Sequence, residues 1–209
     1  KFSYTLYDGL GRVYETGEMS YNGDGGPVFA DIFGTNVGGM TIPNVIDDTK
    51  LAAWLNFDPT FTRKEVTRNY YDKTNTVIGT EVTSLNSLNT ATQRKRIVHV
   101  AYMEVYSANA NEYDHATHYD YDIHGNVKTL YQDNRLIKNI AGIGDQRLKR
   151  LDYIYDLISG NVHRVDYQTG NADQWHHSYN YDADNRITDV YTTLETPLTT
   201  ANSSVASLQ

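Results

Sequence analysis

The sequence predicts an all-β protein built as a strip of antiparallel β-hairpins. A Tyr-Asp pair, followed by a turn residue and then an aliphatic residue, recurs along the chain. Segments between these pairs alternate between apolar and polar residues, as half-buried strands do. The composition agrees, because 18 tyrosines against 5 phenylalanines and 2 tryptophans supply rings that pack on one side and keep a hydroxyl hydrated or bonded.

The recurring pattern is Y-D-x-x-[GN]-x-[VI], and the fourth of its five copies carries one extra residue. The copies are "YDGLGRV" from Tyr7, "YDKTNTV" from Tyr71, "YDIHGNV" from Tyr121, "YDLISGNV" from Tyr155 and "YDADNRI" from Tyr181. Each predicts a hairpin with a short loop, formed by a type I turn and closed by a bulge whose first residue has positive φ. We call this pattern the hairpin signature.

Three positions of the hairpin signature have predicted structural roles. Glycine or asparagine supplies the positive φ, at Gly11, Asn75, Gly125, Gly160 and Asn185. Aspartate accepts a bond from a backbone N–H two residues on, at Asp8, Asp72, Asp122, Asp156 and Asp182. Tyrosine faces the aliphatic residue across the strands, at Tyr7, Tyr71, Tyr121, Tyr155 and Tyr181. The same register places Asp120 opposite Lys128.

Outside the hairpin signatures the chain divides into a repeat region over residues 1–192 and a Ser/Thr-rich tail or linker over 193–209. A long strand is expected from Arg96 to Tyr106, and a further hairpin around Gly170-Asn171. Residues 20–65 predict an irregular insertion with glycine-rich loops and one short helix over 47–56. The chain begins within a strand-like pattern, so we expect a fragment of a longer protein.

These signatures resemble YD repeats, and the chain resembles the RHS (rearrangement hot spot) repeat proteins, the superfamily that includes teneurins and the C components of Tc toxins. The segments "YDYDIHGNVKTLYQD", "YDLISGNVHRVDYQTG" and "YNYDADNRITDV" resemble the repeat region of large RHS proteins from Bacteroidota. The resemblance implies that the strip is a segment of a spiralling, hollow β-shell. In bacterial members the shell encloses a C-terminal toxin; in teneurins it belongs to an adhesion receptor. The self-cleavage motif of the family has no match here.

Composition disfavours several classes of protein. The net charge of −8 disfavours nucleic acid as a partner, because nucleic-acid binding depends on lysine and arginine at phosphates. The absence of cysteine excludes disulfides and thiolate chemistry, and it is compatible with either a reducing cytosol or secretion without disulfides. No apolar stretch approaches the roughly 18 residues of a membrane-spanning helix. No signature of a nucleophilic hydrolase, metalloprotease or nucleotide-binding loop is present.

Two clusters of polar residues are candidate sites. His115, His118 and His124, with Asp114, Asp120 and Asp122, are the densest group of possible metal ligands. Residues three apart on a strand point to opposite faces, so we expect no metal and no cofactor. Asp120 and Asp122 could serve as a carboxylate pair of a hydrolase, but the turn accounts for Asp122, so we expect no catalytic residues and no enzyme.

The sequence therefore predicts a non-catalytic structural segment of a large secreted or surface-displayed bacterial protein. Its expected partners are neighbouring repeats and a C-terminal cargo domain, and open sheet edges predict self-association. The alternative is an adhesion module that binds carbohydrate or protein through exposed tyrosines with Trp54 and Trp175. An exposed aromatic row would favour binding, and rings buried between layers would favour the shell.

Overall fold

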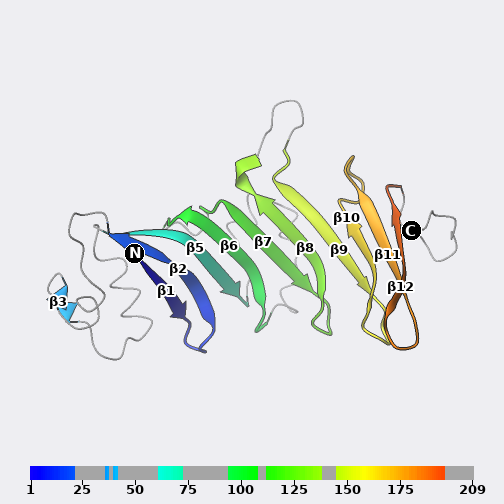
Figure 1. Cartoon of the computed structure of the whole chain (residues 1–209), viewed down its shortest axis with the longest axis horizontal. Helices are drawn as coiled ribbons and strands as arrows, with labels where there is room; N and C mark the ends of the chain where they lie inside the picture. The colour runs from blue at the N-terminus through cyan, green and yellow to red at the C-terminus, as the bar shows by residue number, and fades with distance from the viewer. Residues whose placement is uncertain are drawn as a thin grey trace. The chain divides into compact units, whose positions relative to one another are not determined.

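The computed structural model of the chain describes residues 1–21, 36–37, 40–41, 61–72, 94–107, 112–137 and 145–195. It is all-β, as the sequence predicts (Figure 1). Its strands are β1 (Phe2–Tyr7), β2 (Val13–Tyr21), β3 (Asn36–Val37), β4 (Met40–Thr41), β5 (Phe61–Tyr71), β6 (Ile97–Val105), β7 (His115–Tyr121), β8 (Val127–Asn134), β9 (Leu148–Tyr155), β10 (Val162–Tyr167), β11 (Trp175–Tyr181) and β12 (Ile187–Thr193). A short 3-10 helix, η2 (Arg135–Ile137), follows β8. Among the described residues no helix is long and apolar enough to cross a membrane.

Ten strands form one sheet in the order β1-β2-β5-β6-β7-β8-β9-β10-β11-β12. The order follows the chain, and consecutive strands pair antiparallel, for example β7 with β8 and β8 with β9. β3 and β4 form a separate two-stranded ladder. Because each strand pairs with its neighbours along the chain, short turns suffice to build most of the sheet.

The chain divides into two compact units, and the repeat region expected over 1–192 stays a prediction. Unit 1 comprises Lys1–Tyr70 with Val100–Asp114, and unit 2 comprises Tyr71–His99 with His115–Gln209. Unit 1 contains β1, β2, nearly all of β5 and most of β6. Unit 2 contains β7 to β12, which lie side by side in Figure 1.

Among its described residues, unit 2 buries few apolar side chains. Its buried apolar residues are Val98, Ala116, Tyr131 and Val165. Its buried polar residues are more numerous: His99, His118, Asp120, Thr129, Asp133, Arg147, Asp166, Gln168 and His176. A buried polar group is costly unless it is hydrogen-bonded or paired with an opposite charge. The stability of unit 2 therefore depends on how these groups are paired.

Four hairpin signatures close as predicted. The tyrosine faces the aliphatic residue in the pairs Tyr7–Val13, Tyr121–Val127, Tyr155–Val162 and Tyr181–Ile187. The loop residues with positive φ are Gly11 (75°), Gly125 (102°), Gly160 (75°) and Asn185 (62°). The hairpin predicted around Gly170 is also present, between β10 and β11.

Each of the four signature hairpins contains a second bulge that the sequence did not reveal. One residue directly after the aliphatic position is skipped in the register of the second strand: Tyr14, Lys128, His163 and Thr188. Asp120 consequently pairs with Thr129, and the predicted pairing with Lys128 is wrong. The extra residue shifts the alternation of side chains, so it decides which residues of each second strand are buried.

The second hairpin signature closes differently from the prediction. The N–H of Asp72 donates to the carbonyl of Arg96 at 3.2 Å, and the N–H of Lys95 donates to the Asp72 carboxylate at 2.5 Å. Lys95 has the positive φ, 62°. The short loop predicted after Tyr71 is therefore wrong, and Asn75, expected at positive φ, lies outside the described residues. Arg96 and Lys95 occupy the places that Asn126 and Gly125 have in the third signature.

The expected insertion over 20–65 is narrower than predicted at both ends, because β2 continues to Tyr21 and β5 begins at Phe61. The helix predicted over 47–56 lies outside the described residues, as does Trp54. Within the insertion the structure describes only β3 and β4. The tail beyond residue 195 lies outside the described residues too, and β12 ends at Thr193.

Candidate functional site

The aspartates of the hairpin signatures bind backbone N–H groups of their own turns. The Oδ1 atom of Asp122 accepts bonds from Gly125 N–H at 2.7 Å and from Asn126 N–H at 2.9 Å. Asp182 accepts bonds from Asp184 N–H and Arg186 N–H, both at 2.9 Å. Asp122, one of the two carboxylates considered for acid-base chemistry, is therefore engaged in closing a turn.

These bonds favour the ionised form of each carboxyl group. Backbone N–H groups within the turn are the foremost cause that lowers the pKa of Asp8, Asp156 and Asp182. Burial raises the pKa of Asp122, but hydrogen bonds led by the N–H of Asn126 outweigh it, and that pKa is also lowered. All four aspartates thus have a folded-state pKa below the ordinary aspartate value of 3.8.

Acid should therefore weaken the turns. A carboxyl group whose pKa is lower in the folded state stabilises the fold above its unfolded pKa, and this contribution is lost as the pH falls through the folded pKa. We expect the urea midpoint of unfolding to drop as the pH is lowered below about 4. Asp182→Asn should flatten the dependence in this window. A wild-type urea midpoint that stays constant as the pH falls from about 5 into the acid range would contradict the assignment of these aspartates to the turns.

The tyrosines of three hairpin signatures join one hairpin to the preceding strand. Each hydroxyl donates to a backbone carbonyl: Tyr121 to Ile97 at 2.6 Å, Tyr155 to Val127 at 2.9 Å and Tyr181 to Val162 at 2.7 Å. For the latter two the acceptor is the aliphatic residue of the previous signature. We call these the tyrosine–carbonyl bonds. They connect successive hairpins through side chains in addition to the backbone ladder.

A continuous row of polar side chains crosses unit 2 from β7 to β12. Successive members are direct cross-strand partners: Asp120, Thr129, Asp152, Asp166, His176 and Thr193. We call it the polar row. Side chains on one face alternate along each strand, so the row exists only because the bulges bring these residues into one alignment.

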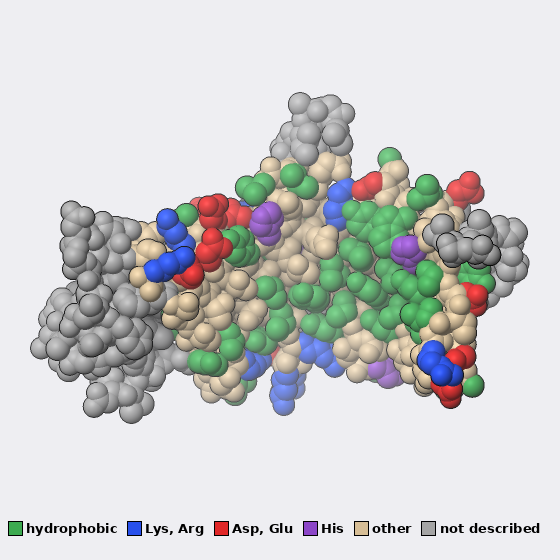
Figure 2. Space-filling model, in the orientation of Figure 1, with side chains coloured by type: hydrophobic (Ala, Val, Ile, Leu, Met, Phe, Trp, Pro, Cys, Tyr) green, Lys and Arg blue, Asp and Glu red, His purple; other side chains and the backbone are tan. Residues whose placement is uncertain are grey.

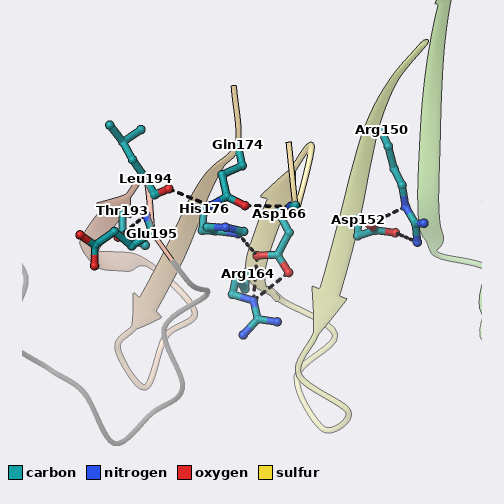
Figure 3. A network of polar contacts seen from close by, with 10 residues as sticks. Arg150, Asp152, Arg164, Asp166, Gln174, His176, Thr193, Leu194 and Glu195 are labelled. Carbon is teal, nitrogen blue, oxygen red and sulfur yellow. Dashed lines mark hydrogen bonds and ion pairs between the residues drawn. The ribbon is translucent and has the colours of Figure 1, made fainter. Parts of the chain in front are cut away.

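Hydrogen bonds and arginines pair the acidic members of the polar row (Figure 3). Thr129 Oγ1 donates to Asp152 Oδ1 at 2.8 Å. His176 Nδ1 lies 2.8 Å from Asp166 Oδ1, with the histidine 1% exposed. Asp152 and Asp166 face each other across β9 and β10, and each has an arginine two residues earlier on its own strand. Arg150 Nε lies 2.7 Å from Asp152, and Arg164 lies 3.0 Å from Asp166.

A second buried cluster in unit 2 centres on Asp133. Arg147 binds it with two parallel bonds, Nε to Oδ1 at 2.6 Å and Nη2 to Oδ2 at 2.9 Å. His118 Nε2 lies 3.7 Å from the same carboxylate, and the His118 ring lies 5.2 Å from that of His99. Burial, together with the neighbouring His118, lowers the pKa of His99 to about 3. His99 is therefore neutral at neutral pH.

Unit 1 has its own buried ion cluster around Glu15, which is 1% exposed. Arg63 Nη1 donates to Oε1 at 2.8 Å, and Arg68 donates to Oε2 through Nε at 2.9 Å and Nη2 at 2.5 Å. The hydroxyl of Tyr4 also donates to Oε1, at 2.8 Å. Arg63 lies over the ring of Tyr106, 3.2 Å from its centroid. Such a fully bonded carboxylate positions strands and has no free oxygen for a reaction.

The predicted metal-ligand candidates do not converge. His115 is exposed whereas His118 is fully buried, as their spacing on one strand predicts. His124 stands in the turn with a 63% exposed side chain, 3.9 Å from Asp122. Asp120 receives the N–H of Tyr121 at 3.0 Å. Within the described residues no three histidine or acidic side chains gather in a way that could hold a metal ion.

The opposite face of unit 2 is aromatic and partly exposed. One row of cross-strand partners runs Tyr119, Leu130, Leu151, Tyr167 and Trp175, and a second runs Tyr153, Val165 and His177. The rings of Tyr167 and Trp175 stack at 5.2 Å, and His177 lies 4.5 Å from Trp175. Figure 2 shows hydrophobic side chains gathered over β9, β10 and β11. We call this surface the aromatic face.

Comparisons with known proteins give no family for this chain. A search of protein-family models finds none that matches, and a search of curated proteins finds no match either.

Proposed function

We propose that this chain is a non-catalytic structural segment of a larger β-shell of the RHS type. The tyrosine–carbonyl bonds carry the proposal. Tyrosine is the most characteristic residue of the hairpin signature. In three signatures its hydroxyl donates to a backbone carbonyl at the preceding strand: Tyr121, Tyr155 and Tyr181. Because this residue binds the neighbouring repeat, its recurrence supports a structural role for the repeat.

The polar groups of the described residues support the same role. The signature aspartates close turns, and Asp133 and Glu15 are each held by arginine in buried clusters. Catalytic carboxylates work as a pair whose environments separate their pKa values, inside an accessible cleft. In this chain Asp120 and Asp122 serve a strand end and a turn, so a hydrolase is the less favoured role.

The resemblance of the hairpin signatures to YD repeats extends the proposal beyond this chain. In such an assembly neighbouring repeats are the partners, and the shell encloses a C-terminal toxin or other cargo. A secreted or surface-displayed bacterial protein is the setting that this role implies. The net charge of −8 agrees with a role that involves no nucleic acid.

A carbohydrate-binding role is the second candidate, and the aromatic face favours it. Trp175 stacks with Tyr167, and His177 stands beside it with its Nδ1 2.7 Å from Thr192 Oγ1. Sugars are bound by such stacked rings with polar groups at their edge. These rings are half-buried rather than sandwiched between two described layers, so the aromatic face is open to a ligand or to a neighbouring part of a shell.

A glycan array with the full chain separates the two roles. A structural segment should bind no glycan selectively, and Trp175→Ala should leave the array unchanged while lowering thermal stability, because a large ring is lost from the aromatic face. Leu157→Ala is the control, since Leu157 is 86% exposed in a turn and should change neither. Selective binding that disappears in Trp175→Ala but persists in Leu157→Ala would establish the carbohydrate role instead.

A further inference from the structure

The last hairpin repeats an arrangement that unit 2 uses twice to join hairpins. The hydroxyl of Tyr155 donates to the carbonyl of Val127, and that of Tyr181 donates to the carbonyl of Val162. Ile187 holds in β12 the place that Val162 holds in β10, since each faces the signature tyrosine of its own hairpin. The Ile187 carbonyl is thus the next acceptor in the series, and no hydroxyl among the described residues donates to it.

The matching donor stands at the other end of the sheet order. Tyr7 is the signature tyrosine of the first hairpin, and β1 is the first strand of the sheet, with a described neighbour on one side alone. The Tyr7 side chain is 43% exposed, and its hydroxyl donates to no carbonyl in the described part of the chain. The edge strands β1 and β12 therefore carry the two halves of one tyrosine–carbonyl bond.

The edge of β12 that pairs with no described strand, here called its free edge, also has outward-facing backbone groups. The carbonyl of Arg186 accepts a bond from Asp182 N–H at 2.9 Å and so faces β11. Alternation then turns the carbonyl of Ile187 away from β11. The bulge at Thr188 shifts the alternation by one residue, which turns the N–H and carbonyl of Val190 to the free edge. β12 can consequently accept another strand.

The register of such an added strand follows from those already present. Successive hairpins meet at the β8–β9 and β10–β11 pairings, here called the two joints. In each joint, the residue two positions after the aliphatic residue pairs with the residue three positions before the next signature tyrosine: Thr129 with Asp152, and Arg164 with Ser178. The same spacing places Asp189 of β12 opposite Tyr4 of β1, and Val190 opposite Ser3. Both joints give the same alignment, in which Tyr7 reaches the carbonyl of Ile187.

We propose that the β12 edge of this chain binds the β1 edge of a second copy, head to tail, with the Tyr7 hydroxyl donating to the Ile187 carbonyl. The proposal rests on the proposed function, because a segment that continues a larger sheet needs both edges open. Neither strand contains the lysine or proline that commonly blocks an edge. Since the contact joins two different surfaces, each added copy exposes a new edge and the assembly grows.

Sedimentation of the full chain over a concentration series tests this contact. Wild type should increase in mass with concentration and continue beyond a dimer. Val190→Pro blocks the β12 edge and Ser3→Pro blocks the β1 edge, and proline is tolerated where the lost N–H faces away from the sheet. Each variant alone should be monomeric, and their equimolar mixture should form a dimer and stop, because one open β12 edge meets one open β1 edge.

A hydroxyl deletion tests the tyrosine–carbonyl bond itself. Tyr7→Phe should weaken association about fivefold, the effect of one lost hydrogen bond. Tyr179→Phe, which removes the hydroxyl of a half-buried tyrosine of β11 outside the hairpin signatures, should leave association unchanged. Equal association by Tyr7→Phe and wild type would overturn the assignment of Tyr7 as the donor.

Two results would overturn the head-to-tail contact: a proline variant that dimerises alone, which indicates like edges pairing, or an equimolar mixture that stays monomeric. Circular dichroism checks that each variant folds. If a proline variant does not fold, Val190→Lys or Ser3→Lys takes its place, since a charged side chain also blocks an edge. Monomers in every sample overturn this contact alone, because the glycan array tests the proposed function independently.

Discussion

Replacing Arg147 with methionine should lower the free energy of unfolding by about 3–5 kcal/mol, the usual result of removing one partner of a buried ion pair. Arg147 and Asp133 have side chains 4% and 0% exposed and share two hydrogen bonds. Without the guanidinium the buried carboxylate would lose both of these charge-assisted bonds, and His118 Nε2 lies 3.7 Å from it, beyond hydrogen-bond distance. Urea denaturation measures the loss.

A double variant distinguishes the lost pair from lost packing. Asp133→Leu combined with Arg147→Met removes both charges and keeps apolar volume, so it should recover most of the stability that the single change removes. The matched exposed pair is Arg186 with Asp182, in which the arginine side chain is 72% exposed. Arg186→Met should cost at most about 1 kcal/mol. A similar loss from Arg147→Met and Arg186→Met would contradict the assigned importance of the buried cluster.

Gly125→Val should also destabilise strongly, by about 2–4 kcal/mol, as the sum of two costs. Gly125 has a φ of 102°, a region that is strained for a β-branched residue. A Cβ atom there would also lie 2.7 Å from Arg96 Nη2, so the end of this flexible side chain must shift, which weakens the contact of its guanidinium with the Tyr121 ring, now 5.3 Å from the centroid. Thermal and urea unfolding measure the change.

Gly160→Val is the matched control for the second cost. Gly160 has a φ of 75°, and a Cβ atom added there meets nothing within 4 Å. It should show only the backbone strain, about 1–3 kcal/mol, and therefore a smaller loss than Gly125→Val. If Gly125→Val leaves stability unchanged, the role assigned to positive φ in the hairpin signature is wrong.

Features that depend on neighbouring residues alone could be predicted from the sequence. An Asp–Gly pair separated by two residues, as in Asp122 and Gly125, sets a turn through bonds within a few residues. The turn then fixes the first cross-strand pair, Tyr121 with Val127, and with it the hairpin. The all-β class and four of the five hairpins followed from this local chemistry.

Features that depend on distant residues could not be predicted in this way. Lys95 closes the turn begun at Asp72, although nothing in "YDKTNTV" distinguishes that copy from the others. The second bulge moved the partner of Asp120 by one residue, and with it every later pair. The polar row and the Asp133 cluster arise only after several strands have been aligned, so no window of sequence contains them.

The closure at Asp72 has a consequence for how such a sheet can change. Two strands are joined there by the bond from Asp72 N–H to the Arg96 carbonyl and by the bond from Lys95 N–H to the Asp72 carboxylate. Residues 73–95 separate the two closing residues in the sequence, whereas in the third hairpin only residues 123–125 separate Asp122 from Asn126. The loop of a hairpin is therefore separable from its register. New sequence can be inserted, exchanged or lengthened at this point without altering which strand residues meet, so the turns are where a chain of this kind can acquire diversity.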